Sequence, residues 1–185
     1  MKNTASGGSG VAERVKPVLH AVKEALPLPK ALKEHEWLRR LLGKWHVDAE
    51  FFKEPGKHPE KTEGAENVRN VGDFWVVSEY TGTFMEQPFR GLLTLGYDPE
   101  RRKYIGNWIG SMASERWEYE GTLDPTGNIL TLEGEGICSM HPGKLTRVRE
   151  VIELKCKDNR RFISSMLGDD GNWVTTMICN YTRRS

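Results

Sequence analysis

The chain has 185 residues, of which 27 are basic and 26 are acidic, so its formal net charge at pH 7 is +1. A near-neutral chain of this length fits one domain that can bury a core without metal or disulfide support. Its basic and acidic residues are interleaved, which argues against a nucleic-acid-binding protein, because such proteins concentrate basic side chains on one surface.

The cysteines and the N-terminal segment bear on the cellular compartment. Cys138, Cys156 and Cys179 are widely spaced and odd in number, which argues against a disulfide framework and favours a reducing environment. Residues 1–10 are rich in glycine and serine and lack the apolar stretch of a signal peptide. No apolar run approaches the roughly 20 residues that cross a bilayer. We therefore expect a soluble cytoplasmic protein with neither nucleic acid nor membrane as a partner.

Residues 11–42 are predicted to form a helical arm behind a disordered leader at residues 1–10. A first helix is predicted because apolar residues recur at spacings of three and four, which puts them on one face: Val15, Val18, Leu19, Val22 and Leu26. Pro27 and Pro29 must interrupt this helix. A second helix is expected from Lys30 to Leu42, with Gly43 as its stop.

After Gly43 the apolar period changes from that of a helix to that of a strand. Trp45, Val47, Ala49 and Phe51 alternate with polar residues, as in a half-buried strand. Similar short runs follow, separated by turn signals: Pro55-Gly56, Gly72-Asp73, Asp98-Pro99, Asp124-Pro125 with Gly127, Pro142-Gly143, Asp158-Asn159 and Asp169-Asp170-Gly171. These signals indicate about ten strands and no helix that could connect parallel strands.

The predicted fold class is mainly β, with residues 43–185 forming an antiparallel β-barrel of about 8–10 strands. Closing the sheet removes its exposed edges. A barrel of this size can hold one small ligand. A two-sheet sandwich built from the same strands remains the alternative.

Strand alternation also indicates which side chains point inward. Glu150 falls on the apolar face of its strand, and Glu115 shares a face with Trp117 and Tyr119. A buried carboxylate is costly unless it is paired or hydrogen-bonded. Glu115 and Glu150 are therefore expected to mark a polar spot in a cavity. Alternatively they lie at the barrel rim, or in water if the register is shifted by one residue.

Other aromatic and apolar positions complete the expected cavity. Trp108 shares its face with Gly106 and Gly110, which leave room for a ligand or, more simply, for a packed neighbour. The last strand places Met177, Cys179, Tyr181 and Arg183 on one face. The predicted ligand-binding residues, for a small apolar molecule, are Trp108, Glu115, Trp117, Tyr119, Glu150, Met177 and Tyr181.

The sequence contains no recognisable catalytic, metal or cofactor motif. His46 is the only histidine in a predicted strand, and it lies on the polar face, so haem binding by an inward histidine is not expected. The chain lacks the spacings typical of zinc ligands, of a serine nucleophile and of a phosphate-binding loop. We predict no metal, no cofactor and no catalytic residue.

Gly43-Lys44-Trp45, which opens the first strand after a short helix, resembles the Gly-x-Trp signature of lipocalins and calycins. The resemblance implies a lipocalin-like (calycin-like) barrel in which the tryptophan packs under the closed end. It also implies that an arginine of the last strand lies across this tryptophan, and Arg183 or Arg184 is in position for that role.

A wider pattern from residue 33 to residue 184 resembles the bacterial domain of unknown function 1579 family. Six segments carry it: Glu34–Leu38, Leu42–Trp45, Leu95–Pro99, Tyr104–Trp108, Trp117–Asp124 and Met166–Trp173. The resemblance implies a calycin-like barrel in a family without an assigned activity, and it supplies no catalytic residue.

Three functions fit these observations. The favoured one is binding of a small apolar molecule in the barrel cavity. The second is a hydrolase or isomerase in which Glu115 and Glu150 act as an acid–base pair. The third is a protein interaction module with a packed barrel, in which the helical arm docks onto a partner or onto a second copy as a homo-oligomer.

Overall fold

The structure, a computed structural model, describes residues 29–53, 57–137 and 145–184. The predicted leader, the first predicted helix, and the turn signals Pro55-Gly56 and Pro142-Gly143 lie outside the described residues. Among the described residues, no helix is both long enough and apolar enough to span a membrane.

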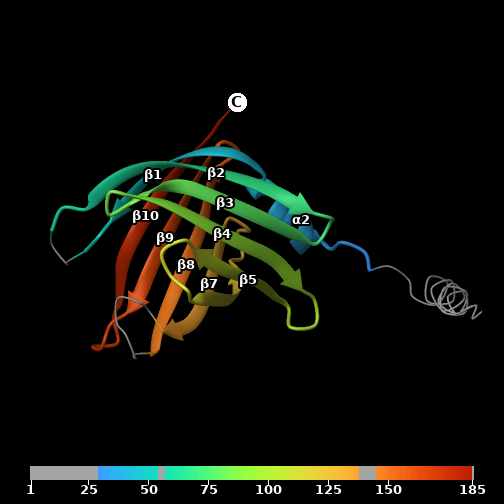
Figure 1. Cartoon of the computed structure of the whole chain (residues 1–185). Helices are drawn as coiled ribbons and strands as arrows, with labels where there is room; N and C mark the ends of the chain where they lie inside the picture. The colour runs from blue at the N-terminus through green and yellow to red at the C-terminus, as the bar shows by residue number, and fades with distance from the viewer. Residues whose placement is uncertain (1–28, 54–56, 138–144, 185) are drawn as a thin grey trace, which may run out of the picture. The chain divides into compact units, whose positions relative to one another are not determined.

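Ten strands form one closed antiparallel barrel (Figure 1). Each strand pairs with its neighbours in the sequence, and β1 pairs with β10 to close the sheet. The strands are β1 (Gly43–Phe51), β2 (Glu60–Val71), β3 (Trp75–Phe84), β4 (Gln87–Asp98), β5 (Lys103–Gly110), β6 (Arg116–Leu123), β7 (Ile129–Ile137), β8 (Leu145–Cys156), β9 (Asn159–Leu167) and β10 (Trp173–Arg183). The predicted antiparallel barrel is confirmed, and the sandwich alternative is wrong.

The local patterns that predicted the strands are those that build the barrel. Trp45, Val47 and Ala49 on β1 are each at most 1% exposed, as their alternation requires. Three predicted turns contain a glycine in the left-handed region, with φ of 59° at Gly72, 72° at Gly127 and 79° at Gly171. Glycine adopts this conformation without the steric penalty that other residues meet.

Helical residues cover the barrel end that holds the β2–β3, β4–β5, β6–β7 and β8–β9 connections. They comprise α2 (Lys33–Leu38) and the single 3-10 turn η1 (Arg39–Leu41). The Trp37 indole donates a hydrogen bond to the carbonyl of Gly127 (2.9 Å), and Arg39 bonds Asp73 (2.7 Å). This end is the closed end of the barrel.

The helix is shorter than the predicted range of Lys30 to Leu42. Leu32 is extended, with ψ of 170°, and its backbone N–H donates to Nδ1 of His35 at 2.9 Å. That bond gives Nδ1 of His35, whose side chain is buried at 3% exposure, a hydrogen-bond partner. The helix therefore begins at Lys33, after the N-cap Leu32, and not at Lys30.

The tryptophan and arginine that the lipocalin resemblance implies do meet at the closed end. The guanidinium of Arg183 lies 4.1 Å from the ring centroid of Trp45, and its Nη1 donates to the carbonyl of Leu42 (2.5 Å). Gly43 has φ of +117°, and a Cβ there would lie 2.6 Å from Nη1 of Arg183, so the motif requires glycine. Arg184 instead contacts the imidazole of His46 at 3.2 Å.

The interior beneath the helix is filled by side chains. The core residues of this region are each at most 2% exposed: Leu38, Leu41, Trp45, Leu95, Tyr104 and Leu130. They come from the helical cap and from strand positions near the closed end. Their packing leaves the other half of the barrel as the region where a cavity can form.

Candidate functional site

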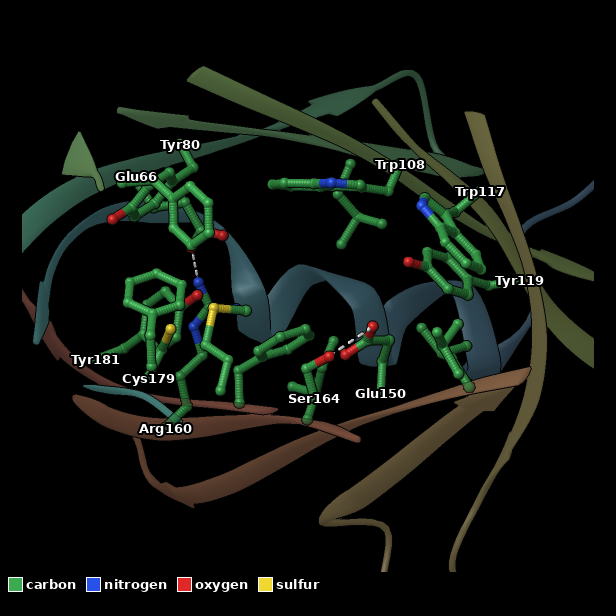
Figure 2. Close-up of a pocket in the computed structure, with 18 of the residues that line it drawn as sticks. Glu66, Tyr80, Trp108, Trp117, Tyr119, Glu150, Arg160, Ser164, Cys179 and Tyr181 are labelled. Atoms are coloured by element: carbon green, nitrogen blue, oxygen red, sulfur yellow. Dashed lines mark hydrogen bonds and ion pairs between the residues drawn. The ribbon is translucent and has the colours of Figure 1, made fainter. Parts of the chain in front are cut away.

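A cavity of about 300 Å³ lies inside the barrel, and all ten strands contribute side chains to it (Figure 2). Its lining is rich in aromatic residues: Phe51, Tyr80, Phe84, Phe89, Trp108, Trp117, Tyr119, Phe162 and Tyr181. Phe51 ends β1 and Phe84 ends β3, so the cavity extends toward the end of the barrel opposite α2.

The cavity brings together most of the residues predicted to bind a ligand. The predicted residues that line it are Trp108, Trp117, Tyr119, Glu150, Met177 and Tyr181. Glu115 is not among the lining residues, because β6 begins at Arg116 and the inward alternation of the strand does not extend to Glu115. The hypothetical acid–base pair of Glu115 and Glu150 is therefore not assembled.

The space expected beside Trp108 is filled by protein atoms. A Cβ at Gly110 would lie 3.2 Å from the ring of Phe89, and one at Gly91 would strike the Trp108 indole itself. These glycines let two aromatic rings lie flat against the sheet. The packed neighbour, and not a ligand, is thus the occupant of the space at Gly110.

Glu150, on β8, is one of the two buried acids that line the cavity and is 7% exposed. The Ser164 hydroxyl donates a hydrogen bond to its Oε1 at 3.1 Å, and Tyr119 also contacts the carboxyl. Its Oε2 has no hydrogen-bond partner among the described residues. Burial raises the pKa of Glu150 to about 8, against the smaller opposing effect of the two hydroxyl groups.

A second polar group in the cavity is the buried ion pair of Glu66 and Arg160, whose side chains are 7% and 5% exposed. The Ser78 hydroxyl donates to Oε1 of Glu66 at 2.5 Å. The Arg160 guanidinium lies 4.6 Å from the ring centroid of Trp45 and 4.1 Å from that of Tyr181. Burial lowers the pKa of Arg160 to about 10, which leaves the guanidinium charged at neutral pH.

Sequence reasoning missed this ion pair for different reasons at its two residues. Glu66 follows Thr62 and Gly64 on the inner face of β2, and Val68 is the one apolar residue on that face, so the apolar alternation is too short to mark it. Arg160 shares the face of β9 that carries Phe162 and Met166, so the side-chain period of two could have indicated that it points inward.

One cluster of potential metal ligands lies on the outer surface of β1 and β2. The ligand atoms of His46, Asp48 and Glu63 lie within 4.8 Å of one another. Nε2 of His46 is 3.2 Å from the Asp48 carboxylate, and Nδ1 faces Arg184. His46 therefore points away from the cavity, as its strand position predicted, and its imidazole is already occupied by protein partners.

The fold and the site together define the class of this protein: a ten-stranded antiparallel barrel, capped by a helix at one end and containing an aromatic cavity. Residues 30–183 match the family described as "Protein of unknown function (DUF1579)". The chain belongs to this family, as the sequence segments predicted. No curated protein matches it.

Two solved structures are similar to this chain at low sequence identity. Rv2717c from M. tuberculosis aligns with a TM-score of 0.60 and 14% identity, over 84% of this chain and 100% of that chain. A redesigned β-barrel, mFAP0, was solved bound to DFHBI and aligns with a TM-score of 0.44 and 13% identity, over 78% of this chain and 99% of that chain. The similarity to Rv2717c concerns the fold alone.

Proposed function

We propose that this protein binds a small, largely apolar molecule inside the barrel. The observation that carries the proposal is the cavity of about 300 Å³, with aromatic walls and few polar groups. Small-molecule sites typically have volumes of about 300–1,000 Å³, mainly apolar linings and a few placed polar groups. The cavity therefore suits a ligand of two or three fused or linked rings, or an aliphatic chain of similar volume.

The cavity contrasts with the solid packing under the helical cap. Protein interiors are close-packed and contain few voids larger than a water molecule. An apolar space of this size costs stability when it is left empty, because the lining atoms lose their contacts. A ligand that restores those contacts is the simplest reason for a barrel to be filled at one end and hollow toward the other.

Exposed apolar side chains lie at the barrel end opposite α2. Met85 in the β3–β4 connection is 54% exposed, Met112 in the β5–β6 connection is 48% exposed, and Leu145 at the start of β8 is 63% exposed. Flexible methionine side chains adapt to varied apolar surfaces. We propose that the ligand enters at this end.

Binding is favoured over the two alternative functions. The carboxyl pair proposed for catalysis is incomplete, because Glu115 does not line the cavity. An interaction module with a solid barrel would not contain this cavity. Docking by the predicted arm at residues 11–42 concerns mainly residues outside the described ranges, and it remains a prediction.

The proposal can be tested by filling the cavity from one strand. Val148 faces the cavity, whereas Val151 lies on the outer face of the same strand, β8. We would titrate wild type, Val148→Phe and Val151→Phe with phenylnaphthylamine, an uncharged dye that becomes fluorescent in apolar surroundings. We expect Val148→Phe to weaken dye binding at least tenfold and Val151→Phe to bind as wild type does.

Circular dichroism would confirm that both variants fold. Dye binding that is equal in all three proteins would place the dye outside the barrel and overturn the proposal, as would the absence of binding to the wild type.

A further inference from the structure

The geometry points to a more specific ligand class: we infer that the cavity selects apolar molecules that carry a protonated amine, and that the carboxyl of Glu150 binds this amine. The inference rests on the binding function proposed above. It depends on three observations, which are an unsatisfied oxygen, a charge imbalance and the aromatic walls around the carboxyl.

The unsatisfied oxygen is Oε2 of Glu150. The carboxyl group is buried and faces the cavity, and Ser164 donates only to the other oxygen, Oε1. Among the described residues, Oε2 forms no hydrogen bond of good geometry, although the Tyr119 hydroxyl contacts the carboxyl group. Buried polar atoms in native proteins almost always have a partner. A hydrogen-bond donor on the ligand would supply the missing partner of Oε2.

Two acids, Glu66 and Glu150, and one arginine line the cavity, so the cavity carries a net negative charge when Glu150 is ionised. Arg160 is the only cationic side chain among the lining residues, and it pairs with Glu66. An ionised Glu150 therefore has no protein cation to balance it. Because an isolated buried charge is costly, a ligand that is itself a cation is the partner that Glu150 lacks.

Aromatic rings border the same part of the cavity. Figure 2 shows Trp117 and Tyr119 on the side of Glu150, with Trp108 above it and with Arg160, Glu66 and Tyr181 grouped on the other side. The faces of tryptophan and tyrosine attract cations, and most strongly so where water is excluded. A carboxylate beside such rings suits an ammonium group on an apolar body.

An anionic ligand is a poor fit to the same cavity. The Arg160 guanidinium is paired with Glu66 and lies against the rings of Trp45 and Tyr181. A ligand carboxylate or phosphate at Arg160 would have to share the guanidinium with Glu66 and would meet the negative charge of that acid, although Nε of Arg160 has no hydrogen-bond partner among the described residues. Arg160 is thus already paired with Glu66, whereas Glu150 has no cation among the residues that line the cavity.

Cation binding must depend on pH, because burial raises the pKa of Glu150 to about 8. The groups that face or act on Glu150 are Tyr119 from β6, Ser164 from β9 and Cys179 from β10, with the ion pair of Glu66 and Arg160 across the cavity. Burial keeps the Cys179 thiol neutral by raising its pKa to about 12, and it also raises the pKa of Tyr119. Glu150 is therefore the group that must lose a proton when a cation binds near pH 7.

The test compares three molecules of the same shape and different charge. Naphthylmethylamine, naphthylmethanol and naphthoate would compete with bound phenylnaphthylamine in wild type, Glu150→Gln and Glu115→Gln. The last variant is a matched control, since it removes an acid that does not line the cavity. For the wild type at pH 7 we expect the amine to compete at least tenfold more strongly than the alcohol, and naphthoate to compete least.

The expected pattern is specific to Glu150. Glu150→Gln should lose the preference for the amine, measured relative to its own affinity for the dye, and Glu115→Gln should keep the preference. In the wild type, the affinity for the amine should rise close to tenfold from pH 6 to pH 7, and the affinity for the alcohol should stay constant.

Equal competition by the three molecules, or a preference for naphthoate, would overturn the amine inference while leaving the binding function in place. A preference for the amine that survives Glu150→Gln would overturn the role of Glu150. Failure of the dye itself to bind would count against the binding function, so the two proposals fail in distinguishable ways.

Discussion

Removing one partner of the Glu66–Arg160 ion pair is expected to destabilise the barrel more than removing both. The two side chains are 7% and 5% exposed, so each remains largely removed from bulk water when its partner is lost. Breaking a buried ion pair in this way typically costs about 3–5 kcal/mol. Arg160→Met and Glu66→Gln should each fall in that range.

The double variant leaves no buried charge at this position. The amide introduced by Glu66→Gln keeps an oxygen that can accept the Ser78 hydroxyl, and methionine replaces the length of the arginine stem. The remaining loss is the contact of the guanidinium with the rings of Trp45 and Tyr181, worth about 2 kcal/mol. The double variant should therefore be more stable than either single variant.

Urea unfolding at pH 7, followed by circular dichroism, gives the free energy of unfolding for the four proteins. Equal slopes against urea would show that the same surface is exposed in each. If the double variant loses the sum of the two single losses, Glu66 and Arg160 are not coupled and the described ion pair does not exist in solution.

Three further predictions concern other parts of the barrel. The folded-state pKa of Glu150 is about 8 and lies above its ordinary value of 4.5, so its contribution to stability is full below about pH 4.5 and is lost as the pH rises through 8. The melting temperature of Glu150→Gln relative to that of the wild type should therefore be higher at pH 8 than at pH 5. Parallel profiles of the two proteins would contradict this. Arg183→Ala should reduce the free energy of unfolding by about 1–3 kcal/mol, because it removes the ring contact with Trp45 and hydrogen bonds to the carbonyls of Leu42 and Lys157. An unchanged urea midpoint would show that the arginine adds nothing. Gly91→Ala should push the Trp108 indole into the cavity and weaken phenylnaphthylamine binding severalfold, with a shift in tryptophan fluorescence; neither change would be seen if the ring can move aside without cost.

The fold was largely accessible from the sequence because the barrel is built from local signals. The alternation from Trp45 to Phe51 marks the first strand, and turn pairs such as Asp98-Pro99 mark the connections. An antiparallel barrel with neighbouring strands paired requires no long-range information beyond closure. The register at Glu150 followed from the same alternation and proved to be inward.

The candidate site was accessible only in part, since it depends on where strands begin and on polar inner faces. Glu115 lies two residues before Trp117, which would place both on one face of a continuous strand. The strand starts at Arg116, however, and the alternation of side chains does not extend beyond its end. Glu66 lies on an inner face without apolar neighbours on one side, so periodicity could not place it. The pairing of Glu66 with Arg160 joins β2 to β9 across the barrel, and a single sequence carries no local signal for such a contact.

The central claim is that a ligand binds inside the barrel and not on its surface, and the methionine methyl groups can test it directly. Met166 and Met177 line the cavity, whereas Met85 and Met112 are exposed, at 54% and 48%, at the barrel end opposite α2. In a nuclear magnetic resonance titration of methyl-labelled protein with phenylnaphthylamine, we expect saturable shifts of the Met166 and Met177 signals. Shifts confined to Met85 and Met112, or no shifts, would contradict binding in the cavity.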